Sequence, residues 1–82
     1  MNPVVSYIKQ TLQGYYPDSE LVPMAKLLLT QVFGMSVVEL YAGKDTTFSV
    51  NEQKRLDDIL VRLQKLEPIQ YIIGTEEVYG LT

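Results

Sequence analysis

The side chains of this sequence that could carry out chemistry are carboxylates, hydroxyls, tyrosines and a few cations, because the chain contains neither histidine nor cysteine. A Ser-His-Asp triad, a thiol nucleophile and a zinc finger are therefore excluded. Carboxylates are paired at Asp57-Asp58 and at Glu76-Glu77. Because adjacent side chains on a helix point about 100° apart, Asp57 and Asp58 do not easily meet at one substrate atom. We interpret both pairs as solvated charges and predict no catalytic, cofactor-binding or metal-binding residue.

Phosphate binding and nucleic-acid binding are not indicated either. The sequence has no G-x-G-x-x-G motif and no P-loop. Its net charge of −3 and its pI of about 4.7 have the wrong sign for a nucleic acid or an anionic membrane as partner. The cations of one predicted helix are interleaved with acids, and we interpret Lys54, Asp58 and Arg62 as a solvated ladder of charges. No membrane span or secretory signal is visible, so we expect a cytoplasmic protein without nucleic-acid or membrane partners.

Tyrosine is the side chain most suited to binding here, and the chain has six tyrosines. A tyrosine buries a large ring while its hydroxyl remains available to a partner, as at many interfaces. Two of the six, Tyr71 and Tyr79, flank Gly74 and are the candidate interface residues. The other four are expected to cover a small core: Tyr7, Tyr15, Tyr16 and Tyr41.

Helices must position these side chains, because the apolar residues recur with helical spacing. Asn2-Pro3 predicts the start of a first helix, which carries Val5, Ile8 and Leu12 on one face and ends at Gly14. A second, more apolar helix is predicted to begin at Asp18 or Ser19 and to end at Gly34.

Two capping boxes predict the next two helices. The segment Ser36-Val37-Val38-Glu39 begins a short helix that Gly43 ends, and Ser49-Val50-Asn51-Glu52 begins a helix that runs to about Leu66. The buried face of this longer helix is predicted to hold Leu56, Ile59, Leu60, Leu63 and Leu66.

The last part of the chain is predicted to contain a fifth, short helix. Pro68 can begin a helix over Ile69 to Ile73, which Gly74 ends. Residues 78–81 could form a strand, although no second strand is predicted to pair with it. The sequence therefore predicts an all-α fold: a bundle of four to five helices over residues 1–74, followed by a segment over residues 75–82 that starts a linker strand or hairpin.

The residues of this last part resemble a known family. Glu67-Pro68-Ile69-Gln70-Tyr71-Ile72-Ile73-Gly74, followed by Glu77-Val78-Tyr79-Gly80-Leu81, is similar to the E-P-x-x-Y-I-x-G…F-Y-G-L segment of the release-factor glutamine methyltransferases of the HemK type. In that family the segment joins an N-terminal helical bundle to the catalytic domain, and the upstream order of helices is similar as well. The family usually has glycine where Leu66 stands, so we expect a less sharp break between the fourth and fifth helices.

The resemblance implies a division of labour between two domains. The parent enzyme would transfer a methyl group from S-adenosylmethionine to the glutamine side-chain amide of the G-G-Q motif in peptide-chain release factors. The helical domain would recognise the release factor, and Tyr71 and Tyr79 would contact the enzyme's own catalytic domain. The family's cofactor loop and its N-P-P-Y motif match no residue of this chain, so no catalytic or cofactor-binding residue is carried over.

Two other readings of the sequence remain open. The first is a stand-alone helical module for protein–protein interaction, without enzyme activity. The unpaired strand sequence at the end of the chain favours the domain of a methyltransferase over this module. The second, a small acid–base enzyme that uses its carboxylates, has the least support.

Overall fold

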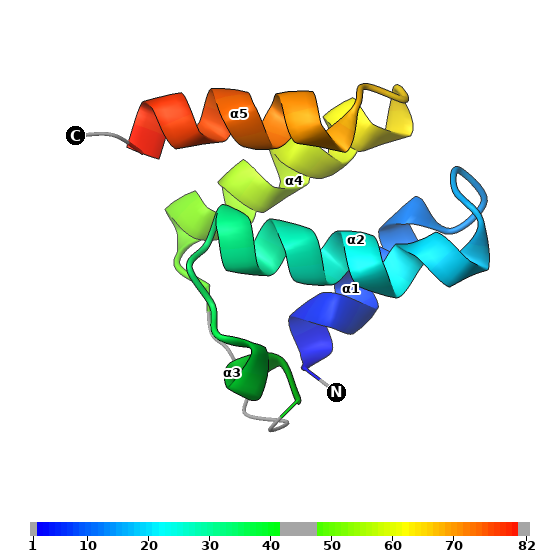
Figure 1. The fold of residues 1–82 in the computed structure, drawn as a ribbon, viewed down its shortest axis with the longest axis horizontal. Coiled ribbons are helices and arrows are strands. Elements are labelled where there is room, and N and C mark those ends of the chain that lie inside the picture. The colour runs from blue at the N-terminus through cyan, green and yellow to red at the C-terminus, as the bar shows by residue number, and fades with distance from the viewer. Residues whose placement is uncertain (1, 42–47, 81–82) are drawn as a thin grey trace.

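Five helices follow one another along the described part of the chain (Figure 1). The computed structural model describes residues 2–41 and 48–80, with the side chains of residues 2–41 and 48–76. The helices are α1 (Pro3–Leu12), α2 (Asp18–Gln31), α3 (Val37–Tyr41), α4 (Val50–Gln64) and α5 (Ile69–Gly80). No strand is found within the described ranges. The predicted all-α class is confirmed.

Local hydrogen bonds at the predicted positions begin three of these helices. The Asn2 side-chain oxygen accepts a hydrogen bond from the Val4 backbone N–H at 2.8 Å and so caps α1. At α4, the Glu52 N–H donates to the Ser49 hydroxyl at 3.1 Å, and the Ser49 N–H donates to the Glu52 carboxylate at 3.0 Å. The same reciprocal pair begins α3, between Ser36 and Glu39. Both predicted capping boxes are confirmed.

Two of the predicted glycine stops are confirmed by the backbone. Gly14 follows α1 with a φ of 91°, and Gly34 follows α2 with a φ of 69°. Glycine adopts this left-handed conformation without the steric cost that a Cβ atom adds. The third predicted stop, Gly43, lies outside the described residues.

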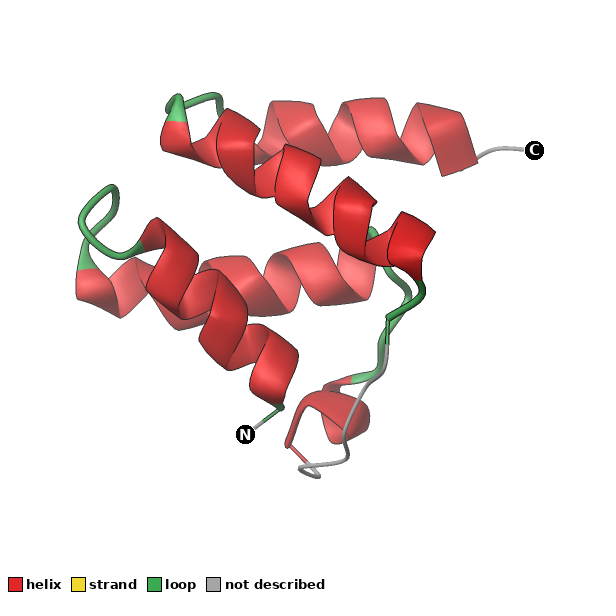
Figure 2. Cartoon of the chain, turned by 180° about the vertical axis from the view of Figure 1, so that it is seen from behind, coloured by secondary structure: helices red, strands yellow, loops and turns green. Residues whose placement is uncertain are grey.

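The core lies between two layers of helices. Figures 1 and 2, which show opposite sides of the molecule, place α1 and α4 in one layer and α2 and α5 in the other. The short α3 packs against α2. All five helices contribute fully buried aliphatic side chains to the core, among them Ile8, Leu28, Leu40, Leu60 and Ile72.

The predicted apolar faces are confirmed with one exception. Val5, Ile8 and Leu12 of α1 are buried, as are four of the five residues predicted on α4. Leu66 is the exception, because its side chain is 64% exposed. It keeps the helical spacing from Leu63, but α4 ends at Gln64, so Leu66 lies in the turn that follows and leaves the buried face.

The predicted end of the fifth helix at Gly74 is wrong. The helix α5 continues to Gly80, so the strand predicted over residues 78–81 is replaced by helix as far as Gly80, and residues 81 and 82 lie outside the described part. A helix stops when a residue turns left-handed, and Gly74 does not. Contacts of Thr75 and Glu76 with α4 also hold the turn that follows Gly74. Tertiary contacts therefore extend this helix past its glycine.

Candidate functional site

The turn between α4 and α5 is a Schellman motif with a leucine at its left-handed position. The Leu66 N–H donates to the Leu63 carbonyl at 2.9 Å, and the Glu67 N–H donates to the Arg62 carbonyl at 3.2 Å. Leu66 has a φ of 64°, and it is the one non-glycine residue with positive φ in residues 2–41 and 48–80. The expectation of a less sharp break at Leu66 is therefore wrong. The chain makes the turn that glycine makes, with leucine in the conformation that glycine adopts freely.

The Arg62 side chain contacts both this turn and α5. Its Nε and Nη2 donate to the same carboxylate oxygen of Glu67, at 3.1 and 3.0 Å, and its Nη1 donates to the Thr75 hydroxyl at 3.1 Å. The guanidinium also lies 5.8 Å from the centre of the Tyr71 ring, within the range of a cation–π contact. The hydrogen bond with Glu67 is the main cause of the raised pKa of Arg62. One arginine thus joins the turn to two successive turns of α5.

A second arginine of α4, Arg55, binds the residue of α5 that follows Thr75. Arg55 Nε donates to the Glu76 carboxylate at 2.8 Å, and its Nη2 donates to the Glu76 backbone carbonyl at 3.3 Å. The Glu76 side chain is only 14% exposed. The Arg55 guanidinium carbon also lies 5.6 Å from the centre of the Phe33 ring, which is itself stacked on Phe48. Arg55 therefore connects α5 to the stacked pair of Phe33 and Phe48.

A groove with a volume of about 370 Å³ runs between α4 and α5. It is lined by Asn51, Lys54, Arg55, Asp58, Ile59, Arg62 and Glu76. Arg55 and Glu76 are bonded to each other, and Ile59 is the one apolar residue of the lining. The resemblance assigns S-adenosylmethionine to motifs that match no residue of this chain, so no cofactor role is given to the lining of this groove.

The paired carboxylates do not form a catalytic pair in the structure. Asp57 accepts hydrogen bonds from the Tyr7 hydroxyl at 2.6 Å and from the Gln53 amide at 3.0 Å, whereas Asp58 is exposed and lines the groove on another face of α4. Glu76 is held by Arg55, and the side chain of Glu77 lies outside the described residues. The interpretation of both pairs as solvated charges holds for the exposed Asp58 and is wrong for Asp57, which is half-buried and hydrogen-bonded, and for Glu76, which Arg55 binds at the covered side of α5.

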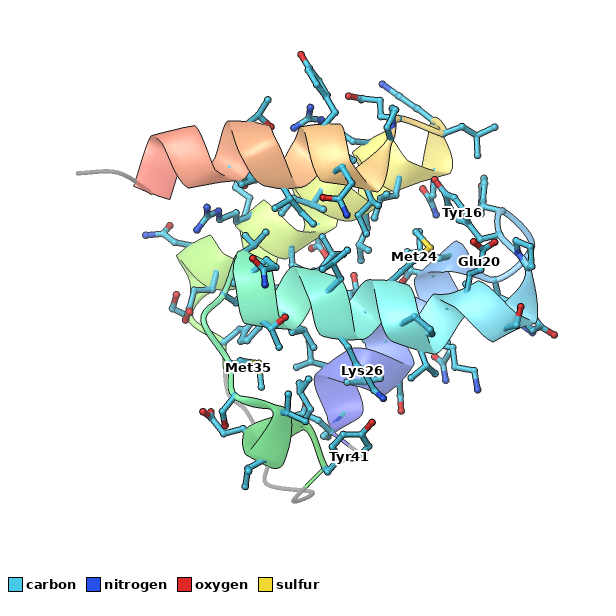
Figure 3. All side chains as sticks on the ribbon, viewed as in Figure 1. Tyr16, Glu20, Met24, Lys26, Met35 and Tyr41 are labelled. Carbon is cyan, nitrogen blue, oxygen red and sulfur yellow. The ribbon has the colours of Figure 1, made fainter. Side chains whose placement is uncertain are left out.

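Two tyrosine hydroxyls join α1 and the loop after it to α4. The Tyr7 hydroxyl donates to Asp57, and this hydrogen bond is the main cause of the raised pKa of Tyr7. The Tyr16 hydroxyl donates to the Leu63 carbonyl at 2.7 Å. Burial is the main cause of the raised pKa of Tyr16, and the charge of nearby Glu20 adds to it (Figure 3). Both hydroxyls therefore fix the position of α4.

The tyrosines expected over the core divide into two kinds. Tyr16 is half-buried and packs against the core, as expected. Tyr7, Tyr15 and Tyr41 are 41%, 50% and 54% exposed, so the expectation that they cover the core is wrong. The rings of these three tyrosines face solvent. The Tyr41 ring, for example, contacts the Lys26 ammonium, which lies 4.5 Å from the ring centre (Figure 3).

The candidate interface residues are placed only in part. Tyr71 lies on the outer face of α5 and is 61% exposed. Tyr79 lies in the last turn of α5, and its side chain is outside the described residues.

Sequence reasoning missed the contacts of Arg55 and placed Arg62 in a solvated ladder. Their spacing of seven, which is two helical turns, was the available signal that both arginines face the same neighbour.

The fold and this site define a class of protein: a small helical domain. Ion pairs hold its α4–α5 unit, and tyrosine side chains are exposed on its surface. Among the described residues, no group of three acidic, histidine or cysteine side chains is placed to hold a metal ion. Within the same residues, every helix is too short or too polar to cross a lipid bilayer.

The sequence profile of the PrmC N-terminal domain matches residues 4–74, and the chain belongs to this family. A release factor glutamine methyltransferase of Bacteroides thetaiotaomicron is 41% identical over 80 residues, which are 98% of this chain and 29% of that protein. A release factor glutamine methyltransferase of Geobacter sulfurreducens is 37% identical over 54 residues, or 66% of this chain and 19% of that protein. The chain thus spans less than a third of the length of these relatives. No solved structure matches it.

Proposed function

We propose that this chain is the release-factor-recognition domain of an S-adenosylmethionine-dependent enzyme that methylates the glutamine side-chain amide of the G-G-Q motif. The observation that carries the proposal is the 41% identity over 98% of the chain with a protein named release factor glutamine methyltransferase. In this proposal the cofactor and the reacting groups belong to the catalytic domain of the parent enzyme. The parent acts in the cytoplasm, where translation is terminated.

The contribution of the helical domain to such a reaction is positioning. Holding a protein substrate in the right orientation requires a rigid, complementary surface and no titratable group. The bundle is held together where it meets α5, because Arg55 and Arg62 bind Glu76 and Thr75, two adjacent residues of that helix, to α4. Its exposed tyrosines, such as Tyr15 and Tyr71, are side chains typical of protein interfaces.

We further propose a division of the chain near residue 74. Residues 1–74 form the recognition bundle, and residues 75–82 begin the connection to the catalytic domain. Residues 75–80 form the last turns of α5, which is the helix that would carry this connection. Tyr71 and Tyr79 are proposed to contact the enzyme's own catalytic domain, since they lie on the helix that leads to it.

Methyl transfer by the full-length gene product tests this function. With labelled S-adenosylmethionine, we expect the label on the G-G-Q glutamine of the release factor from the same organism. A variant that lacks residues 1–74 is expected to lose efficiency on the whole release factor through a higher KM, while it still methylates a short G-G-Q peptide. Equal kcat/KM on the release factor with and without residues 1–74 would refute a recognition role. Binding of the release factor without any methyl transfer would favour a stand-alone interaction module.

A further inference from the structure

Gly74 lies inside a helix at a place where the surrounding structure does not require glycine. Its φ is not positive, and a Cβ atom built on it would meet nothing within 4 Å. Neither a left-handed turn nor the close approach of another segment therefore explains this residue. In the middle of a helix glycine is less favourable than alanine, because it loses more backbone freedom on folding. The helix therefore opens more easily at Gly74 than at its neighbours.

The contacts that hold α5 change in kind at Gly74. Directly before it, α5 has two side chains buried in the core, Ile72 and Ile73. The two described side chains after it, Thr75 and Glu76, are polar and lie outside the core. The local sequence predicts that the helix ends at Gly74, whereas the structure continues it. Contacts with α4 therefore oppose the local preference, and the balance between the two decides the conformation of the last part of α5.

Arg55 makes two of the hydrogen bonds that hold the segment beyond Gly74. Its Nε donates to the Glu76 carboxylate at 2.8 Å and its Nη2 to the Glu76 backbone carbonyl at 3.3 Å, so it binds both the side chain and the main chain. Arg62 adds one hydrogen bond, to the Thr75 hydroxyl. The Glu76 side chain is only 14% exposed, so water screens this ion pair less than a pair between two fully exposed side chains.

The Arg55 guanidinium is held in place independently of Glu76. Its central carbon lies 5.6 Å from the centre of the Phe33 ring, which is stacked on Phe48. Figures 1 and 2 show α4 and α5 running in opposite directions, so the first turns of α4, which include Arg55, lie beside the last turns of α5. The binding partner of Glu76 is therefore present whether or not the segment beyond Gly74 is helical.

We propose that Gly74 is a hinge of α5 and that the Arg55–Glu76 ion pair is the latch that keeps this hinge closed. With the latch closed, the segment beyond Gly74 continues α5 along α4. With the latch open, α5 ends at Gly74, as the local sequence predicts, and the chain leaves the bundle in another direction. The inference concerns residues of this chain alone and does not rest on the proposed function.

Amide hydrogen exchange, resolved by residue in the full-length gene product, tests the hinge and the latch separately. Glu76→Gln removes the charge of the latch and keeps the shape of the side chain. Gly74→Ala stiffens the hinge, since a Cβ atom has room there and alanine is the better helix former. Asp58→Asn is the matched control, because Asp58 lines the same groove, is exposed, and loses the same charge in the substitution.

We expect the variants to differ only in the amides beyond Gly74. Glu76→Gln raises the exchange rates of the amides of residues 77–80 about fivefold and leaves those of residues 72 and 73 unchanged. Gly74→Ala lowers the rates of residues 77–80 about fivefold, and it restores wild-type protection when it is combined with Glu76→Gln. Asp58→Asn exchanges like the wild type.

Each other outcome contradicts one part of the inference or both. Equal rates in Glu76→Gln and Asp58→Asn overturn the latch. Unchanged rates in Gly74→Ala overturn the hinge, and so does faster exchange of residues 72 and 73 in Glu76→Gln, because α5 then opens as one unit. Free exchange of residues 77–80 in the wild type overturns both. None of these results bears on methyl transfer to the release factor, so the proposed function stands or fails separately.

Discussion

Arg62 and Glu67 are joined twice, once through the backbone and once through their side chains. The Glu67 N–H donates to the Arg62 carbonyl at 3.2 Å, and the Arg62 guanidinium donates two hydrogen bonds to one oxygen of the Glu67 carboxylate. In most Schellman motifs two apolar side chains make the second of these contacts. An ion pair makes it here, and the same guanidinium reaches on to Thr75 of α5. The angle between α4 and α5 therefore depends on a charged contact in the turn.

The strain at Leu66 predicts that a smaller residue stabilises the domain. A left-handed residue with a Cβ atom costs about 1–2 kcal/mol, and glycine gives back about 0.4–1 kcal/mol through the greater freedom of the unfolded chain. We expect Leu66→Gly to raise the free energy of unfolding by about 0.5–1 kcal/mol, measured by urea denaturation. Leu66→Ala is the control, since it keeps the Cβ atom and is expected to gain nothing. A less stable Leu66→Gly would contradict the strain.

The Arg62–Glu67 ion pair is expected to make a small contribution that salt can screen. Both side chains are about one-third exposed, at 29% and 34%, so we expect a coupling free energy of about 0.5–1 kcal/mol. A double-mutant cycle with Arg62→Met and Glu67→Gln measures it, and raising the ionic strength to about 1 M should remove most of it. A coupling that is the same at low and high salt would show that packing of the arginine stem, rather than its charge, holds the turn.

The parts of the fold that the sequence predicts correctly depend on local signals. The Ser49 capping box and the glycine stops at Gly14 and Gly34 involve residues within a few positions of one another, and the structure contains them as expected. The end of α5 was not predictable in this way. Gly74 stays right-handed, and Thr75 and Glu76, in the turn that follows it, are bound by arginines 13 and 21 positions earlier in the chain.

In the candidate site, too, the sequence predicts what depends on local signals and misses what depends on contacts between distant residues. Tyr71 is predicted as an interface residue because it flanks Gly74; its ring is exposed on α5, and the contact itself stays a prediction. The roles of Arg55 and Arg62 were missed, because the helical spacing shows that they share a face and does not show which helix covers it. Leu66 was noted as a departure from the family pattern, but the sequence alone does not reveal that leucine adopts the conformation of the glycine it replaces.

The buried face of α4 gives a prediction about core stability. Leu60 is 1% exposed, whereas the next residue, Val61, is 48% exposed. Leu60→Ala leaves a cavity in the core and is expected to cost about 2–5 kcal/mol, while Val61→Ala should change stability by less than about 0.5 kcal/mol. Chemical denaturation of both variants measures the difference. Equal losses in the two variants would mean that α4 is rotated from the orientation described.

The tyrosine hydroxyls that hold α4 predict a loss of stability at alkaline pH. The pKa of Tyr7 is raised mainly by its hydrogen bond to Asp57, and the pKa of Tyr16 mainly by burial. Below the ordinary pKa of about 10 both hydroxyls are protonated in the folded and the unfolded chain, and their stabilising effect is fully present. Above that pH the unfolded chain releases these protons first, so the free energy of unfolding falls as pH rises through the folded pKa values.

Removal of the two hydroxyls separates this effect from general alkaline denaturation. Tyr7→Phe and Tyr16→Phe should each be about 1 kcal/mol less stable than the wild type at neutral pH, because a hydrogen bond is lost. Between pH ~8 and ~11 the stability of the double variant should decline less steeply than that of the wild type, so that the two curves converge. Urea denaturation at several pH values in this window gives both curves. Parallel curves would mean that neither hydroxyl is held more strongly in the folded chain, and the hydrogen bonds to Asp57 and Leu63 would then contribute nothing to the alkaline transition.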